Sequence, residues 1–435
     1  MKTTYTTIIL LVLCITLGYA QQTPAEPQKE TIAIVGATAH IGNGSVINNS
    51  IIVFKEGKLT SVASANDTST SLDGIKVINA EGKHVYPGFI VPNSTLGLVE
   101  IGAVRATNDQ SEIGSINPHI RSLIAYNAES KIVESLRPNG VLLGQVTPRG
   151  GRISGTSSIV QFDAWNWEDA AIEVDDGIHI NWPNSFSRGR WWLGEDPALK
   201  PNKQYPEQVV ELSTFLDEAK SYLKGSKNSR NLPFEAVEGL FNGNKQLFVH
   251  VDDEKGITDA IAFAEENSIK KLVIVGGYVA YKVADLLKQN NIGVLVQRVH
   301  RRPDGEDHDY DLPYKLAKML VDKGVLVALE TSGQMERMNS RNLPFYAGTT
   351  VAHGLTKEQA LQLITLNTAK ILGINEKYGS LEVGKSATLF ISEGDALDMR
   401  TNKLTHAFID GRDISLETHQ TELWRRYAEK YGIED

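Results

Sequence analysis

Two side chains that can transfer protons lie at the ends of short apolar runs in this chain. His250 follows the run 246–249, and Glu330 follows the run 325–329. An imidazole can act as a metal ligand, a general base or a hydrogen-bond donor, and a carboxylate as a base or a ligand. Side chains alternate along a strand, so Glu330 would face the same side as Ser332, roughly 6.7 Å deeper. We therefore predict that His250 and Glu330 are catalytic, against the alternatives of a packed histidine and a structural ion pair.

A second collection of histidines and acids lies in the segment 300–311. Its His300, Asp307 and His308 are of types that bind transition metals, and they could do so together with His250. A solvated, charged loop is the alternative interpretation of this segment.

Two other segments carry groups suited to ligands. The glycines of the loop 147–156 would expose backbone N–H groups, and Arg149 could hold a carboxylate; a tight structural turn is the alternative. Five of the six tryptophans lie between Trp165 and Trp192. Their rings would form either a wall against a flat ligand or the core of a long insertion.

Strand and helix patterns alternate from about residue 87 onward. Short apolar strands are expected at 141–146, 246–249, 271–275, 293–296 and 325–329, with helical apolar spacing at 257–267, 280–289 and 312–323. This alternation predicts an α/β fold with a parallel sheet and crossover helices, and its length favours a (β/α)8 TIM-type barrel. Sites in such barrels form at the carboxyl ends of the strands, where His250 and Glu330 would lie.

Both ends of the chain have strand patterns of another kind. Turn residues separate β-rich runs at 31–35, 50–54 and 59–62, and further runs follow at 387–391 and 406–411. We expect residues 31–86 and 386–413 to form one composite β-sandwich domain beside a barrel of residues 87–385. A helix is expected at 417–430, within a C-terminal segment 414–435.

Six motifs, in order, resemble signatures of the amidohydrolase superfamily, in its imidazolonepropionase-like branch. They are residues 35–38, 86–90, 341–348, 364–373, 379–385 and 408–411. The resemblance extends from about residue 31 to 413. It implies a (β/α)8 barrel with a β-sandwich built from both chain ends, and a hydrolase for C–N bonds of small molecules. One or two divalent metals would lower the pKa of a bound water and polarise the scissile carbonyl.

The residues that would bind these metals are mostly replaced. The family's His-x-His pair falls at Asn93 and Thr95, its strand-five histidine at His250, its strand-six histidine at Gly276, and its catalytic aspartate at Ser332. The strand-four ligand cannot be assigned. Neutral oxygens bind zinc much more weakly than imidazole or carboxylate does. The resemblance thus implies at most one divalent metal, zinc, held by His250, and no tightly bound binuclear centre.

Two hypotheses of function follow. In the first, the chain hydrolyses C–N bonds, other than peptide bonds, of a small amide or cyclic compound at a rebuilt site. The residues expected to contact the substrate are Asn93, Thr95, Ser332 and Arg149. In the second, the chain is a catalytically inactive binder of small molecules, or a partner subunit of an active relative. Either protein could form homo-oligomers.

Composition and the first residues limit the partners and the compartment. Residues 1–20 pair Lys2 with an apolar run at 8–15, which is typical of a secretory signal peptide, so we expect a secreted, periplasmic protein that is free of the membrane after cleavage. Cys14 is the only cysteine, and cleavage would remove it, which excludes disulfides and thiolate sites. The net charge of −9 argues against nucleic acid and anionic lipid as partners.

Overall fold

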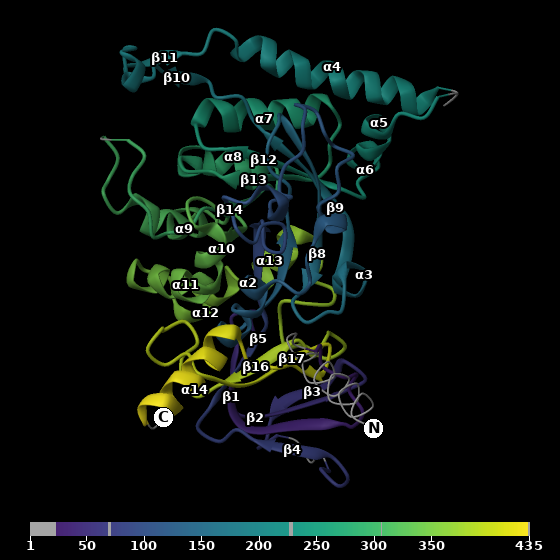
Figure 1. The fold of residues 1–435 in the computed structure, drawn as a ribbon, viewed down its shortest axis with the longest axis vertical. Coiled ribbons are helices and arrows are strands. Elements are labelled where there is room, and N and C mark those ends of the chain that lie inside the picture. Colours follow the sequence, from purple (N-terminus) through teal and green to yellow (C-terminus); the bar gives the residue numbers. More distant parts are fainter. Residues whose placement is uncertain (1–22, 68–70, 226–228, 306, 434–435) are drawn as a thin grey trace, which may run out of the picture.

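The structure, a computed structural model, describes residues 23–67, 71–225, 229–305 and 307–433. Two eight-stranded sheets organise the chain: a barrel, and a smaller domain drawn below it in Figure 1. The predicted signal peptide, residues 1–20, lies outside the described residues. Within the described ranges, no helix is long and apolar enough to span a bilayer.

The smaller sheet is built from both ends of the chain. Its strand order is β18-β17-β16-β5-β1-β2-β3, and β4 also pairs with β1. The strands are β1 (Ile32–His40), β2 (Val46–Lys55), β3 (Lys58–Ser64), β4 (Lys76–Asn79), β5 (His84–Pro87), β16 (Leu389–Ser392), β17 (Leu404–Ile409) and β18 (Arg412–Asp413). The two ends meet where β16 pairs antiparallel with β5. Because β1 pairs with β4 through residues 32–35 and with β5 through residues 38–39, the sheet branches there. The predicted sheet domain beside the barrel is confirmed.

The second sheet is the barrel, with the strand order β6-β7-β8-β9-β12-β13-β14-β15. Its strands are β6 (Phe89–Ser94), β7 (Val141–Val146), β8 (Ile153–Gln161), β9 (Ala171–Asn181), β12 (Gln246–Val251), β13 (Leu272–Gly276), β14 (Gly293–Val296) and β15 (Val327–Leu329). All neighbours are parallel except β8, which runs antiparallel to β7 and β9. The connections 147–152 and 162–170 are shorter than the dozen or so residues that a parallel crossover needs, so this part must form hairpins.

The segment 361–365 closes the barrel between its first and last strands. The Leu329 amide donates to the Leu363 carbonyl at 3.0 Å, and the Ile90 amide donates to the Ile364 carbonyl at 2.9 Å. Backbone groups at the edges of β15 and β6 are thereby satisfied without direct pairing of these two strands.

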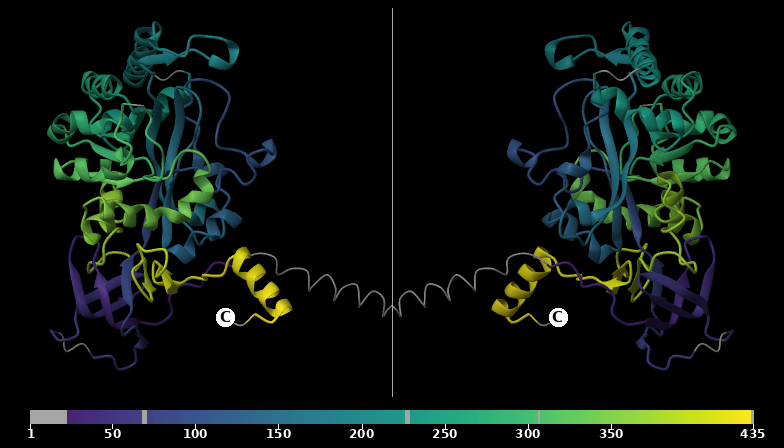
Figure 2. Two further views of the ribbon diagram at one scale, coloured as in Figure 1. Left: turned by 90° about the vertical axis from the view of Figure 1, so that its left-hand side faces the viewer. Right: turned by 90° about the vertical axis from the view of Figure 1, so that its right-hand side faces the viewer.

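Helices cover the outside of the parallel strands. They are α4 (Tyr205–Lys224), α5 (Leu232–Ala236), α6 (Glu238–Asn242), α7 (Glu254–Glu266), α8 (Ala284–Gln289), α9 (Leu312–Asp322), α10 (Glu336–Asn339), α11 (Leu343–Ala352), α12 (Lys357–Gln362) and α13 (Leu366–Leu372), after the short α2 (Lys131–Glu134) and α3 (Trp167–Ala170). Helix α7 begins three residues before the predicted range, because the Asp253 carboxylate caps the Gly256 amide. The C-terminal helix α14 (His419–Tyr431) stands apart from both sheets in the side views of Figure 2.

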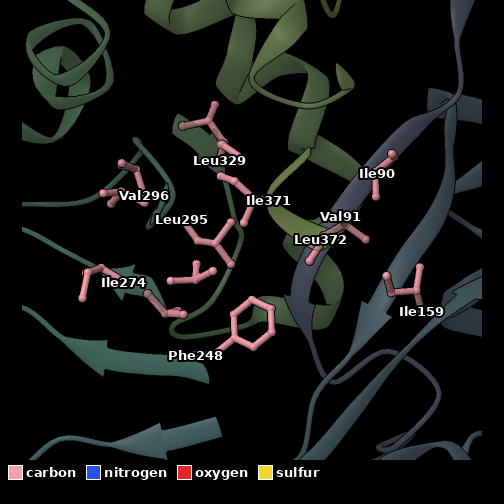
Figure 3. Packing of buried hydrophobic residues seen from close by; sticks show 14 of the residues in the cluster. Ile90, Val91, Ile159, Phe248, Ile274, Leu295, Val296, Leu329, Ile371 and Leu372 are labelled. Carbon is pink, nitrogen blue, oxygen red and sulfur yellow. The ribbon is translucent and has the colours of Figure 1, made fainter. Parts of the chain in front are cut away.

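The barrel core lies between the strands and α13. Figure 3 shows Leu295 and Val296 of β14 and Leu329 of β15 beside Ile371 and Leu372. These side chains are all buried. Apolar packing therefore fixes the strands whose ends carry the polar side chains described below.

We predict that Leu295→Ala lowers the free energy of unfolding by about 2–5 kcal/mol, because it leaves a cavity in this core. Val210→Ala, on the exposed face of α4, is the matched control and should change it by less than about 0.5 kcal/mol. Urea denaturation measures both changes. Equal stability of the two variants would contradict this placement of the core.

Candidate functional site

A cavity of about 400 Å³ opens at the carboxyl ends of four consecutive parallel strands. His250 is the penultimate residue of β12, and Gly276 ends β13. Gln297 directly follows β14, and Glu330 directly follows β15. Ser332, Asp252 and the hairpin residues Phe186 and Leu199, from β10 (Phe186–Arg188) and β11 (Leu199–Pro201), complete its main walls. The strand ends thus bring His250, Glu330 and Ser332 to one cavity, as the sequence predicted for barrel strands.

Glu330 and Ser332 are in direct contact in this cavity. The Ser332 hydroxyl donates to Glu330 Oε1 at 2.7 Å, and the Ser332 amide donates to Oε2. The two side chains are therefore closer than the roughly 6.7 Å expected for residues two apart on a strand. The reason is that β15 ends at Leu329, before both residues. Burial raises the pKa of Glu330 to about 7, although the bonds from Ser332 favour its ionised form. A carboxylate that can exchange its proton near neutral pH thus stands beside Ser332.

Asn93 and Thr95 are bound to an ion pair. The Arg149 guanidinium donates to Asn93 Oδ1 and to the Asn93 carbonyl, both at 2.8 Å, and lies 3.2 Å from Glu336 Oε2. Glu336 Oε1 accepts from the Thr95 amide and hydroxyl at 2.5 and 3.2 Å. Both Asn93 and Thr95 are buried. The carboxylate that Arg149 holds therefore belongs to the chain itself, and contact of Arg149, Asn93 or Thr95 with a substrate stays a prediction.

His250 is paired with a histidine that the sequence analysis missed. His179 lies on β9, and its Nδ1 is 3.0 Å from His250 Nε2. Its ring stacks on Phe248 at a centroid distance of 4.5 Å. Burial lowers the pKa of His179 well below its ordinary value, and burial with the Arg149 charge lowers that of His250 to about 3. The sequence did contain a hint, because His179 lies between two isoleucines, in the alternation typical of a strand.

The metal-binding set expected from the segment 300–311 is not assembled. His300 bonds to Thr349 at 2.8 Å and lines a separate cavity of about 640 Å³, while the His308 ring packs against Tyr278. Across the part of the chain that the structure describes, no three His, Cys, Asp or Glu side chains are arranged to hold a metal ion. The alternative of a charged surface loop describes this segment better.

The tryptophans do not form a shared wall. Trp182 is buried and donates to the Tyr205 hydroxyl at 3.0 Å, whereas Trp165, Trp191 and Trp192 are exposed. Trp191 and Trp192 lie in a short helical turn between β10 and β11, far along the hairpin from its cavity-lining residues. Trp182 and Trp167 pack in the barrel core, as one interpretation expected, whereas the three exposed tryptophans do not join them.

Comparisons with known proteins agree with the fold. A profile described as "Amidohydrolase family" matches residues 314–416. An imidazolonepropionase of Flavobacterium psychrophilum is 29% identical over 110 residues, which cover 24% of this chain and 27% of the relative. An imidazolonepropionase of Syntrophobacter fumaroxidans is 37% identical over 82 residues, 19% of each chain. The chain thus matches only about a quarter or less of the length of these relatives.

Two longer matches extend beyond the C-terminal part. A 5'-deoxyadenosine deaminase of Methanobrevibacter smithii is 22% identical over 384 residues, 80% of each chain. The crystal structure of an amidohydrolase from Thermotoga maritima superposes with a TM-score of 0.76 at 23% identity, covering 88% of this chain and 99% of that one. This likeness shows the barrel fold.

We predict that Glu330→Gln stabilises the protein at pH 8. The pKa of Glu330 is raised from 4.5 to about 7, so the folded state holds the proton more tightly than the unfolded chain does. Its stabilising contribution is complete below about pH 4.5 and is lost as the pH rises through 7. The loss is on the order of 3 kcal/mol, and the neutral glutamine avoids it.

Urea denaturation at pH 4 and pH 8 measures this difference, with the exposed Glu266→Gln as the matched control. Glu330→Gln should have a higher free energy of unfolding than the wild type only at pH 8. Glu266→Gln should match the wild type at both pH values. An equal difference at both pH values would show that Glu330 is not the buried, protonated acid described here.

Proposed function

Because the chain is a member of the amidohydrolase superfamily, in its imidazolonepropionase-like branch, we propose that it hydrolyses C–N bonds, other than peptide bonds, of a small amide or cyclic compound. The observation that carries this proposal is the position of Glu330. Its carboxylate lines the cavity, contacts Ser332 at the position of the family's aspartate, and titrates near neutral pH. A cavity of about 400 Å³ is within the size range of small-molecule sites.

The rebuilt site does not suit the family's divalent metals. Asn93 and Thr95 offer only neutral side-chain oxygens, and both oxygens are already hydrogen-bonded. The guanidinium of Arg149, itself a cation, lies against Asn93. Gly276 has a φ of +90°, and a Cβ there would lie 2.6 Å from Asp252 Oδ1. A metal would have to bind beside a fixed positive charge with one family ligand, His250. The proposed reaction therefore uses only groups of the protein and a water molecule.

Glu330 acts as the general base in this proposal. Its carboxylate takes a proton from a water molecule as the water oxygen attacks the carbonyl carbon. The tetrahedral intermediate then collapses, the C–N bond breaks, and Glu330 returns the proton to the leaving nitrogen. His250 contacts the substrate from the neighbouring wall of the cavity.

The range of substrates to test follows from the relatives. Their names refer to an imidazolone compound and to an amino-substituted purine nucleoside, in both of which a carbon of a nitrogen heterocycle carries the reacting bond. A panel should therefore contain imidazolones, hydantoins, lactams, linear amides and aminopurines.

One observation favours a second candidate, a small-molecule binder without turnover. Four of the five family ligand positions carry other residues, at Asn93, Thr95, Gly276 and Ser332. The same cavity would then hold a ligand that calorimetry detects and that is recovered unchanged. Such a binder could act as the partner subunit of a catalytically active relative.

We predict that Glu330→Gln lowers the turnover of a hydrolysed panel compound by about 10²- to 10⁴-fold, the usual contribution of a general base. Wild-type kcat/KM should rise with pH and level off above about 7, because the ionised carboxylate is the active form. Ammonia release and product mass measure turnover, and Glu266→Gln should match the wild type. Undiminished turnover by Glu330→Gln would overturn the mechanism, and binding without turnover of any compound would favour the binder.

A further inference from the structure

A chain of hydrogen bonds leads from the cavity into the barrel. His250 Nε2 lies 3.0 Å from His179 Nδ1, and His179 Nε2 lies 3.0 Å from Ser157 Oγ. The Ser157 hydroxyl lies 2.8 Å from Asp176 Oδ1. Ser157 and His179 are fully buried, and Asp176 nearly so. Only His250, at the outer end, lines the cavity.

A β-bulge brings Asp176 into this chain. Asp176 and His179 are three residues apart on β9, so a regular strand would point them to opposite faces. The register between β8 and β9 shifts between Ser157 and Ile159, and Asp175 has a φ of +58°. The extra residues re-aim Asp176 toward Ser157, as bulges near functional sites do.

The direction of each hydrogen bond follows from one backbone amide. The Asn93 amide can only donate, and its partner is Gln145 Oε1 at 3.1 Å. Gln145 Nε2 must then face Asp176 Oδ2, at 2.6 Å, and Ser157 Oγ, at 3.3 Å. Two acceptors lie within reach of the Ser157 hydroxyl, Asp176 Oδ1 at 2.8 Å and the Gly177 carbonyl at 3.3 Å. With Asp176 ionised, the single hydroxyl proton goes to the nearer, charged Asp176 Oδ1.

The tautomers of both histidines follow from this arrangement. The Ser157 hydroxyl donates its only proton in the hydrogen bond to Asp176, so its oxygen can only accept from His179 Nε2–H. His179 Nδ1 is then an acceptor, and His250 must donate to it from Nε2–H. His250 Nδ1 is left with a free lone pair.

We propose that Asp176, Ser157 and His179 form a proton relay that makes His250 Nδ1 a proton acceptor at the cavity and Asp176 the terminal store. A proton taken up at Nδ1 releases the Nε2 proton of His250 to His179 Nδ1. His179 passes its Nε2 proton to Ser157 Oγ, and the hydroxyl proton moves to Asp176 Oδ1. One proton has crossed from cavity to carboxylate, and both imidazoles remain neutral.

The charges around the hydrogen-bond relay favour proton transfer from His250 toward Asp176. Burial raises the pKa of Asp176 to about 6, so this carboxyl group can hold a proton near neutral pH. The charged groups that face Asp176 are Glu173, on the same strand, and Lys245, before β12. Lys245 donates to the Ala236 carbonyl at 3.1 Å rather than to Asp176, so the carboxylate remains available for the proton.

The relay deepens the proposed function, since it serves chemistry in the same cavity, but its test does not need turnover. Long-range ¹H–¹⁵N correlation spectra report which nitrogen of each histidine carries the proton. In the wild type at pH 8 we expect Nε2–H on both His179 and His250. In Asp176→Asn the oxygen of the new amide accepts from Gln145, so its NH2 donates to Ser157. The Ser157 hydroxyl then donates to His179 Nε2, at 3.0 Å, rather than to the Gly177 carbonyl, at 3.3 Å, and we expect Nδ1–H on both rings.

Asp175→Asn is the matched control, because Asp175 pairs with Arg121 outside the relay and asparagine tolerates its positive φ. It should leave both tautomers unchanged. Unchanged tautomers in Asp176→Asn would overturn the relay, as would a wild-type His250 that carries its proton on Nδ1.

Two further measurements keep the proposal testable if Asp176→Asn does not fold. Lowering the pH of the wild type through about 6 should protonate Asp176 and produce the same tautomer reversal. Ser157→Ala should abolish that pH response, and Ser157→Thr, which keeps the hydroxyl, should restore it. If the histidine tautomers reverse but no compound of the panel is turned over, the relay is upheld and the hydrolase is refuted. If a compound is hydrolysed but the tautomers do not respond to pH or to Asp176→Asn, only the relay is refuted.

Discussion

The ion pair between Arg149 and Glu336 connects parts of the barrel that no strand pairing joins. Arg149 follows β7, and Glu336 begins α10 after β15; between them lie Asn93 and Thr95 at the end of β6. The first and last strands are otherwise linked through the backbone of 361–365. A partly buried ion pair is costly unless hydrogen bonds satisfy it. Here Arg149 binds the side chain and backbone carbonyl of Asn93, and Glu336 binds the amide and hydroxyl of Thr95. The pair thus fixes the same strand ends that the family would fix with a metal.

The remaining polar groups of the site depend on this fixed charge. Arg149 helps to keep His250 neutral, and the Asn93 amide, at the same strand end, sets the orientation of Gln145 and so of the inner hydrogen bonds. Glu330 and Asp176 remain buried without a cation bonded to them, which raises the pKa of each. Such carboxyl groups reduce stability at neutral pH, and that cost is typical of residues retained for chemistry.

The sequence predicted those parts of the site that depend on regular strands. His250 and Glu330 were found because each follows an apolar run, and parallel strands bring their carboxyl ends together. His179 and Asp176 were missed because β9 enters the barrel through antiparallel hairpins and a bulge, which interrupt the repeat. The partner of Arg149 could not be predicted, since Glu336 is 187 residues away and only the closed barrel brings them together. The tryptophans do not act as one group, because Trp167 and Trp182 pack in the core while Trp191 and Trp192 lie exposed on a hairpin.

Our central claim is that a cation of the protein itself replaces the metal at this barrel end. The most direct measurement is elemental analysis of the wild type purified without chelators and then dialysed, with Arg149→Met analysed in parallel. Zinc and other divalent metals should stay well below one equivalent per chain in both proteins, because removing the guanidinium restores no ligand. One or two equivalents of metal that survive dialysis of the wild type would contradict it.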